Sequence, residues 1–190
     1  MTSIAELWLP ILVSSVLVFV ASSIIWMALP IHKKDYNELP NEAGVMAAMK
    51  AQNVKPGVYV YPWAQGSNTK DPAALEKAKA GPWGQVLVAP RAASMGPTLV
   101  LWFIHIVVLS VFIAYVTGVS LQPGAEYLKV FQVAGAAAFL GYAGGLLPRF
   151  IWEGKPWSLL PGAIFDAVVY TLLTAGAFGW LWPVPSTIAG

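Results

Sequence analysis

The sequence predicts an all-α membrane protein with four transmembrane helices and a small α+β cytoplasmic cap between helices one and two. Three observations predict this fold class. First, 57% of the 190 residues are hydrophobic and only 11% are charged, whereas soluble domains carry about 25% charged residues. Second, four apolar stretches have the roughly 20 residues that a helix needs to cross a bilayer. Third, the basic residues gather on one side of these stretches.

The four stretches divide the chain into parts. Residues 1–30 form helix one, 31–96 a loop domain, 97–183 helices two to four, and 184–190 a tail. Within these parts the apolar stretches run over 7–30, 97–120, about 127–148 and 159–182. The first stretch starts without Lys or Arg and exceeds the apolar run of about 7–15 residues in a signal peptide, so we expect it to be retained as a helix.

The placement of the basic residues predicts the orientation. Only Lys129 lies on the side that holds both termini. The ten others share the side of the loop domain: Lys33, Lys34, Lys50, Lys55, Lys70, Lys77, Lys79, Arg91, Arg149 and Lys155. Because cytoplasmic loops carry the excess of Lys and Arg, we expect the loop domain in the cytoplasm and both termini outside it.

The loop domain is too long to be featureless in a compact protein. Asn41 is placed to cap a helix over 41–52, and Asp71 with Pro72 is a start signal for a second helix over 71–80. Alternating Val and Tyr over 58–61, and the run 85–88, are typical of strands that could pair with each other.

Two ionisable residues lie well inside the apolar stretches. His105 is about 12 Å beyond Pro97 and Asp166 about 10 Å beyond Leu159, at a rise of 1.5 Å per residue. Helices one and three bring hydroxyl groups to the same depth. The predicted intramembrane polar layer therefore comprises His105, Asp166, Tyr142, Ser22 and Ser23.

This layer has two interpretations. In the structural one, which we favour, His105 and Asp166 lie within hydrogen-bond reach and hold the bundle together. In the functional one, they form a proton relay, a substrate contact or a ligand for a pigment or haem. A haem held by two histidines is disfavoured, because His32 lies just past the end of helix one.

Rows of small residues and tryptophans at the helix ends are two further features typical of membrane helices. Small residues at every fourth position let helices approach closely, within the chain or against another subunit. These helix-packing residues are Ala137, Gly141 and Gly145 in helix three and Thr171, Ala175 and Gly179 in helix four. Trp8 and Trp26 flank helix one, where anchoring at the membrane interface explains them.

Several classes of site are disfavoured by composition. The chain has no cysteine, which excludes thiolate nucleophiles, disulfides and cysteine-based metal sites. A net charge of +2 gives no argument for nucleic acid. No phosphate-binding glycine loop, metal-ligand spacing or nucleophile–base pattern is present, so the sequence predicts no catalytic residue and no metal site and leaves any cofactor unknown.

Three stretches, over 55–63, 151–158 and 165–183, resemble a family of small, uncharacterised bacterial inner-membrane proteins with four helices. The resemblance covers most of the chain and implies the bacterial inner membrane. In that membrane, the orientation predicted from the basic residues places both termini in the periplasm. It implies no function.

The sequence therefore favours a non-catalytic accessory or scaffolding subunit of a larger membrane complex. Its expected partners are the lipid bilayer and other membrane subunits, without nucleic acid. A small proton-coupled transporter using the His105 and Asp166 layer is the first alternative. A membrane enzyme acting on lipid or quinone is the second.

Overall fold

The computed structural model describes residues 1–63 and 72–185. The chain divides into two compact units. Residues 1–36 and the chain from residue 94 onward form the helical unit, and residues 37–93 form the inserted unit. Residues 31–36 therefore group with the helices.

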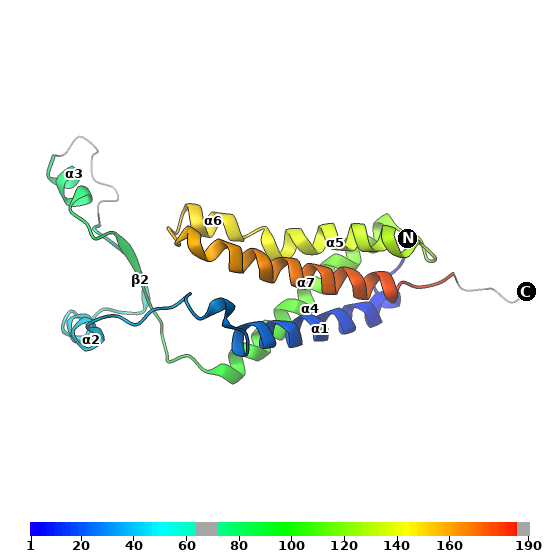
Figure 1. Cartoon of the computed structure of the whole chain (residues 1–190), viewed down its shortest axis with the longest axis horizontal. Helices are drawn as coiled ribbons and strands as arrows, with labels where there is room; N and C mark the ends of the chain where they lie inside the picture. The colour runs from blue at the N-terminus through cyan, green and yellow to red at the C-terminus, as the bar shows by residue number, and fades with distance from the viewer. Residues whose placement is uncertain (64–71, 186–190) are drawn as a thin grey trace, which may run out of the picture. The chain divides into compact units, whose positions relative to one another are not determined.

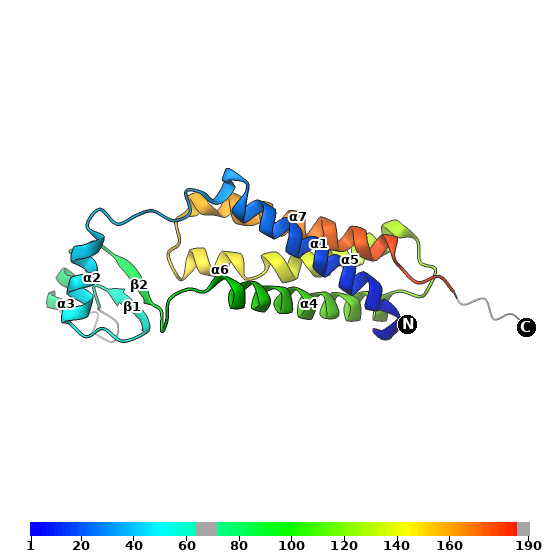
Figure 2. The same cartoon turned by 90° about the horizontal axis from the view of Figure 1, so that it is seen from below.

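The helical unit contains four long helices that lie side by side (Figures 1 and 2). They are α1 (Trp8–Met27), α4 (Met95–Ser120), α5 (Tyr127–Ala143) and α7 (Leu160–Trp180). With the short helices that adjoin them, four segments are long and apolar enough to cross a membrane: Ala5–Met27, Met95–Ser120, Tyr127–Ile151 and Trp157–Trp180. The prediction of four such helices is confirmed.

The packing order of the helices decides which side chains can meet. Both α4 and α7 pack against α1 and α5, so α4 and α7 lie on a diagonal of the bundle. One core cluster includes Leu7, Ile113 and Phe178. A second includes Val18 and Ile106. Each long helix therefore packs mainly on two neighbours: α1 and α5 both contact α4 and α7.

Serine hydroxyls join α1 to α4 within this core. The Ser110 hydroxyl lies 3.2 Å from that of Ser14 and 3.3 Å from that of Ser15. All three side chains are fully buried. Both α1 serines also donate to the carbonyl of Ile11, so their hydroxyls are satisfied without water.

The third span is broken, although the sequence predicts one helix over about 127–148. Helix α5 ends at Ala143, and a separate α6 (Leu146–Ile151) follows Gly144 and Gly145. Pro148 explains the position of the break. It has no N–H to bond the Gly144 carbonyl, and its ring would clash with that carbonyl in a continuous helix.

Small residues permit the close approach of α5 and α7. A Cβ built on Gly135 would lie 3.4 Å from the Cβ of Ala175, which is fully buried. A Cβ on Gly179 would lie 2.7 Å from the ring of Tyr127. Gly145, in contrast, has nothing within 4 Å of such a Cβ, and it lies in the break between α5 and α6.

The other predicted packing residues have different surroundings. Gly141 faces α4, because a Cβ there would lie 2.5 Å from the Leu109 side chain. Ala137 packs against the first core cluster. The Thr171 hydroxyl is buried without a hydrogen-bond partner in the described part of the chain.

The inserted unit contains the predicted helices and strands. They are α2 (Glu42–Ala51), β1 (Gly57–Tyr61), α3 (Pro72–Lys79) and β2 (Gly84–Val88). The strands pair antiparallel, with Tyr59 opposite Val86. Asn41 caps α2 by accepting the amide of Gly44 over 3.0 Å. Asp71, the expected start of the second helix, lies outside the described residues.

We expect Ala175→Leu to destabilise the helical unit by about 1–3 kcal/mol, because extra methylenes in a filled interface force neighbouring side chains out of place. The melting temperature of the detergent-solubilised protein measures this. Ala136→Leu is the matched control, since Ala136 is exposed on α5. Equal melting temperatures for the two variants would contradict the close α5–α7 contact.

Candidate functional site

A buried polar cluster of the helical unit lies where the chain leaves α1. The amides of Ala28 and Leu29 both bond the carbonyl of Ile24, which ends the helix. Leu29 is extended, and Pro30 then starts a one-turn helix over Pro30–His32. This turn directs His32 back toward α7, where its side chain is buried.

A glycine on α7 makes room for the imidazole. A Cβ built on Gly162 would lie 3.2 Å from the Cε1 atom of His32. That spacing is tighter than most side chains tolerate, so a larger residue at this position would displace the ring. The first turn of α7 and the turn after α1 therefore fit each other at this point.

His32 lies between two aspartates, and we call Asp35, His32, Asp166 and Trp26 the aspartate–histidine cluster. The Nδ1 atom of His32 is 2.7 Å from Asp35 Oδ2, and its Nε2 atom is 3.1 Å from Asp166 Oδ1. The Trp26 indole donates to Asp166 Oδ2 over 3.0 Å. Both oxygens of the buried Asp166 carboxylate thus have a partner.

Trp26 also stacks on His32. The two rings are parallel within 2°, and their centroids are 4.0 Å apart. This distance is within the range in which an aromatic face attracts a cation. One tryptophan therefore bonds the carboxylate and supports the imidazolium that the carboxylate attracts.

The surroundings favour the protonated form of His32. Burial by itself lowers the pKa of His32, but the hydrogen bonds and negative charges of Asp35 and Asp166 together outweigh burial and raise it above the usual value. Only an imidazolium can donate from both nitrogens at once. The geometry and the raised pKa therefore agree.

The hypothesis that His105 pairs with Asp166 is wrong. Asp166 bonds His32 and Trp26 instead. His105 is exposed on α4, where it stacks on Trp102 with centroids 5.5 Å apart. Equal depth placed the two residues in one layer, but α4 and α7 lie on a diagonal of the bundle and pack on other helices.

The remaining predicted polar residues make local contacts. Ser22 accepts from the Trp102 indole over 2.9 Å and donates to the carbonyl of Phe19. Ser23 donates to the same carbonyl over 2.8 Å. Tyr142 packs edge-on against Tyr170, with centroids 5.5 Å apart. The five predicted residues therefore form several pairs and not one connected layer.

Sequence reasoning missed Trp26, His32 and Asp35. It assigned Trp26 to the membrane interface and placed His32 beyond the bundle. A usable signal was present, because His32 and Asp35 are separated by three positions directly after Pro30, a spacing that brings side chains together in a turn of helix.

The cluster is suited to holding a proton and to tying helices together. Across the described residues, no group of three or more His, Asp or Glu side chains is arranged to hold a metal ion. Comparisons with protein-family models, curated proteins and solved structures find no match. The resemblance of three stretches to small bacterial membrane proteins therefore stays a prediction.

We expect the stability of the wild-type chain to fall as the pH rises above about 6.5, the usual pKa of histidine. Below that value the folded and unfolded chains both bind the proton, so the stabilisation is complete. It is lost as the pH rises through the raised pKa of folded His32. Melting temperatures between pH 6 and pH 9 measure this loss.

His32→Gln supplies the background for this experiment, because glutamine does not titrate. The wild type should lose more stability across the range than the variant does. Parallel curves for the two proteins would contradict a protonated His32 in the folded state.

Proposed function

We propose that this protein is a non-catalytic accessory or scaffolding subunit of a larger bacterial membrane complex. The observation that carries the proposal is the closed hydrogen bonding of Asp166, whose oxygens accept from His32 and Trp26. Because both carboxylate oxygens accept hydrogen bonds from the same chain, this arrangement favours a structural role for Asp166.

The energetics support a structural role. A charged side chain near the centre of a membrane helix costs at least about 2.5–3.5 kcal/mol on insertion scales. Trp26 and His32 offset that cost, and they come from α1 and the turn after it, whereas Asp166 comes from α7. The cluster thus converts an unfavourable residue into a link between two spans.

A second candidate function is a proton-coupled transporter. The imidazole between two carboxylates, with a raised pKa, favours it. Such an arrangement can pass a proton from one carboxylate to the other when the ring rotates or changes tautomer. Transport further requires that water reach Asp166, which is 8% exposed.

We also propose the orientation of the protein, with the inserted unit in the cytoplasm and the termini in the periplasm. The concentration of ten of the eleven basic residues on the side of the inserted unit supports it. The even number of spans is consistent with both termini on one side.

Truncated fusions to a reporter of compartment test this orientation. Fusions after Gly66 should report the cytoplasm, whereas fusions after Gly124 and Gly190 should report the periplasm. The turn at Gly124 joins α4 to α5, so that fusion counts the spans independently. Identical reports from Gly66 and Gly124 would mean that a helix does not cross.

Substitution of Asp166 separates the two functions. Asparagine can accept from Trp26 and donate to a neutral His32, whose Nδ1–H then donates to Asp35. Leucine removes every one of these bonds. We therefore expect Asp166→Asn to retain a large native complex and Asp166→Leu to lose most of it, measured as particle mass after mild extraction from native membranes.

Glu126→Leu is the control, because Glu126 is exposed before the start of α5. A wild-type particle that contains this chain alone would rule out the scaffold. Dissipation of a proton gradient by the reconstituted wild type, but not by folded Asp166→Asn, would establish the transporter instead.

A further inference from the structure

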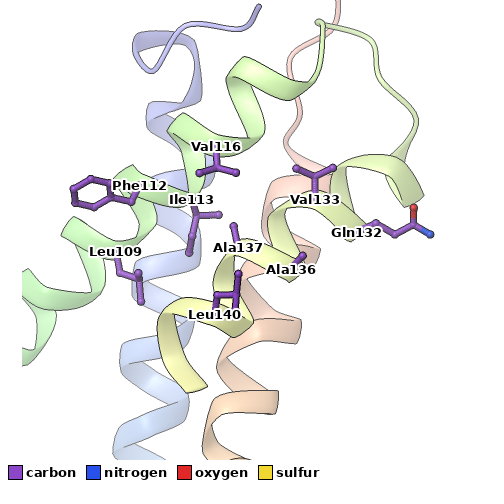
Figure 3. A pocket seen from close by; sticks show the side chains of 9 residues that line it. All are labelled: Leu109, Phe112, Ile113, Val116, Gln132, Val133, Ala136, Ala137 and Leu140. Atoms are coloured by element: carbon purple, nitrogen blue, oxygen red, sulfur yellow. The ribbon is translucent and has the colours of Figure 1, made fainter. Parts of the chain in front are cut away.

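A groove runs along the outer surface of the helical unit between α4 and α5, and we call it the α4–α5 groove. Figure 3 shows its lining, which includes Leu109, Phe112 and Val116 of α4 and Val133, Ala136 and Leu140 of α5. Its volume is about 550 Å³. Gln132 is the one polar residue of the lining and lies toward its edge.

Large side chains line the α4 wall of the groove, and Phe112 is 64% exposed. On the α5 wall, Ala136 and Ala137 lie between Val133 and Leu140, and Leu140 is 72% exposed. A neighbouring backbone can therefore approach α5 closely at the two alanines. Small residues beside large ones are the usual geometry of packing between membrane helices.

His105 extends this surface by one turn of α4. His105, Leu109 and Phe112 are spaced by four and then three positions, which places them on one face of the helix. His105 lies ten residues after Met95, the first residue of α4, or about 15 Å along the axis. It is therefore well inside the span.

The imidazole of His105 has no hydrogen-bond partner within the described chain, and its one ring contact is Trp102. Acyl chains offer neither donors nor acceptors, so lipid around His105 would leave both ring nitrogens unsatisfied. Ionisable residues within membrane spans normally face protein. The exposed position of His105 therefore favours a polar partner from outside this chain.

We propose that the α4–α5 groove and His105 together form the docking face for one transmembrane helix of another subunit, which places a hydrogen-bonding side chain opposite His105. This inference rests on the proposed function, because it names the face through which the subunit would assemble. Apolar side chains of the partner fill the groove beside Ala136. Its polar side chain, a carboxylate, amide or hydroxyl, meets the imidazole one turn further along.

A photoreactive residue tests the face in native membranes. Benzoylphenylalanine replaces Phe112 in the groove, and in a control protein it replaces Leu12, which is 47% exposed on α1. After illumination we expect one discrete protein adduct from position 112 and none from position 12. A second, differently tagged copy of this chain is co-expressed, so that self-association is recognised.

Three substitutions test whether the adduct depends on His105 and on the groove. His105→Leu removes the hydrogen bond and should reduce the adduct from position 112 about threefold to thirtyfold, the range expected for one interhelical hydrogen bond in a membrane. His105→Gln keeps a donor and an acceptor and should preserve it. Ala136→Leu fills the groove and should abolish it, while the melting temperature of each purified variant stays near that of the wild type.

The remaining outcomes overturn the inference. Equal adducts from both positions would show that the face is not selective, and an adduct with the second copy would show the wrong occupant. Adducts with lipid alone would mean that the groove faces the bilayer. If the native complex is large but position 112 gives no protein adduct, the docking face is wrong while the scaffold stands; without a complex, both are wrong.

Discussion

The packing of α1 against α7 depends on one buried carboxylate, that of Asp166, which needs two hydrogen-bond donors. Asp166 lies in a span where water is scarce, and its oxygens are satisfied only when the turn after α1 folds back on α7. Removing His32 would leave an uncompensated charge, and removing Trp26 would leave an unsatisfied carboxylate oxygen; each costs more than the bond itself contributes. The route of the chain after Met27 is therefore tied to a residue about 140 positions away.

This requirement organises the surrounding sequence. Pro30 starts the turn, His32 reaches Asp166, and Gly162 leaves space for the ring. Asp35 then bonds the second nitrogen of the imidazole. Together these residues fix the position of the turn after α1 relative to the start of α7. Apolar contacts between membrane helices are less directional, so they would fix this position less well.

The sequence predicts what depends on local pattern and misses what depends on which helices are neighbours. Apolar length located the four spans, and two short runs rich in valine located β1 and β2, because these signals reside in consecutive residues. The partner of Asp166 could not be deduced in that way. Equal depth favoured His105 and placed His32 beyond the bundle. Only the diagonal placement of α4 and α7, together with the turn after α1, makes His32 the partner of Asp166. The break at Gly144 was predictable from Pro148, which removes a helical hydrogen bond.

That break has a consequence for how the third span fits the membrane. Helix α5 has 17 residues, so its regular part spans about 25 Å, less than the roughly 30 Å of a typical hydrocarbon core. The third span reaches the length of a crossing segment only with α6 included, over Tyr127–Ile151. At about 1.5 Å per residue, its 25 residues exceed the roughly 30 Å of the hydrocarbon core. A kink at the break between α5 and α6 is one way to fit so long a span into the bilayer, whereas the unbroken α4 of 26 residues fits by tilting.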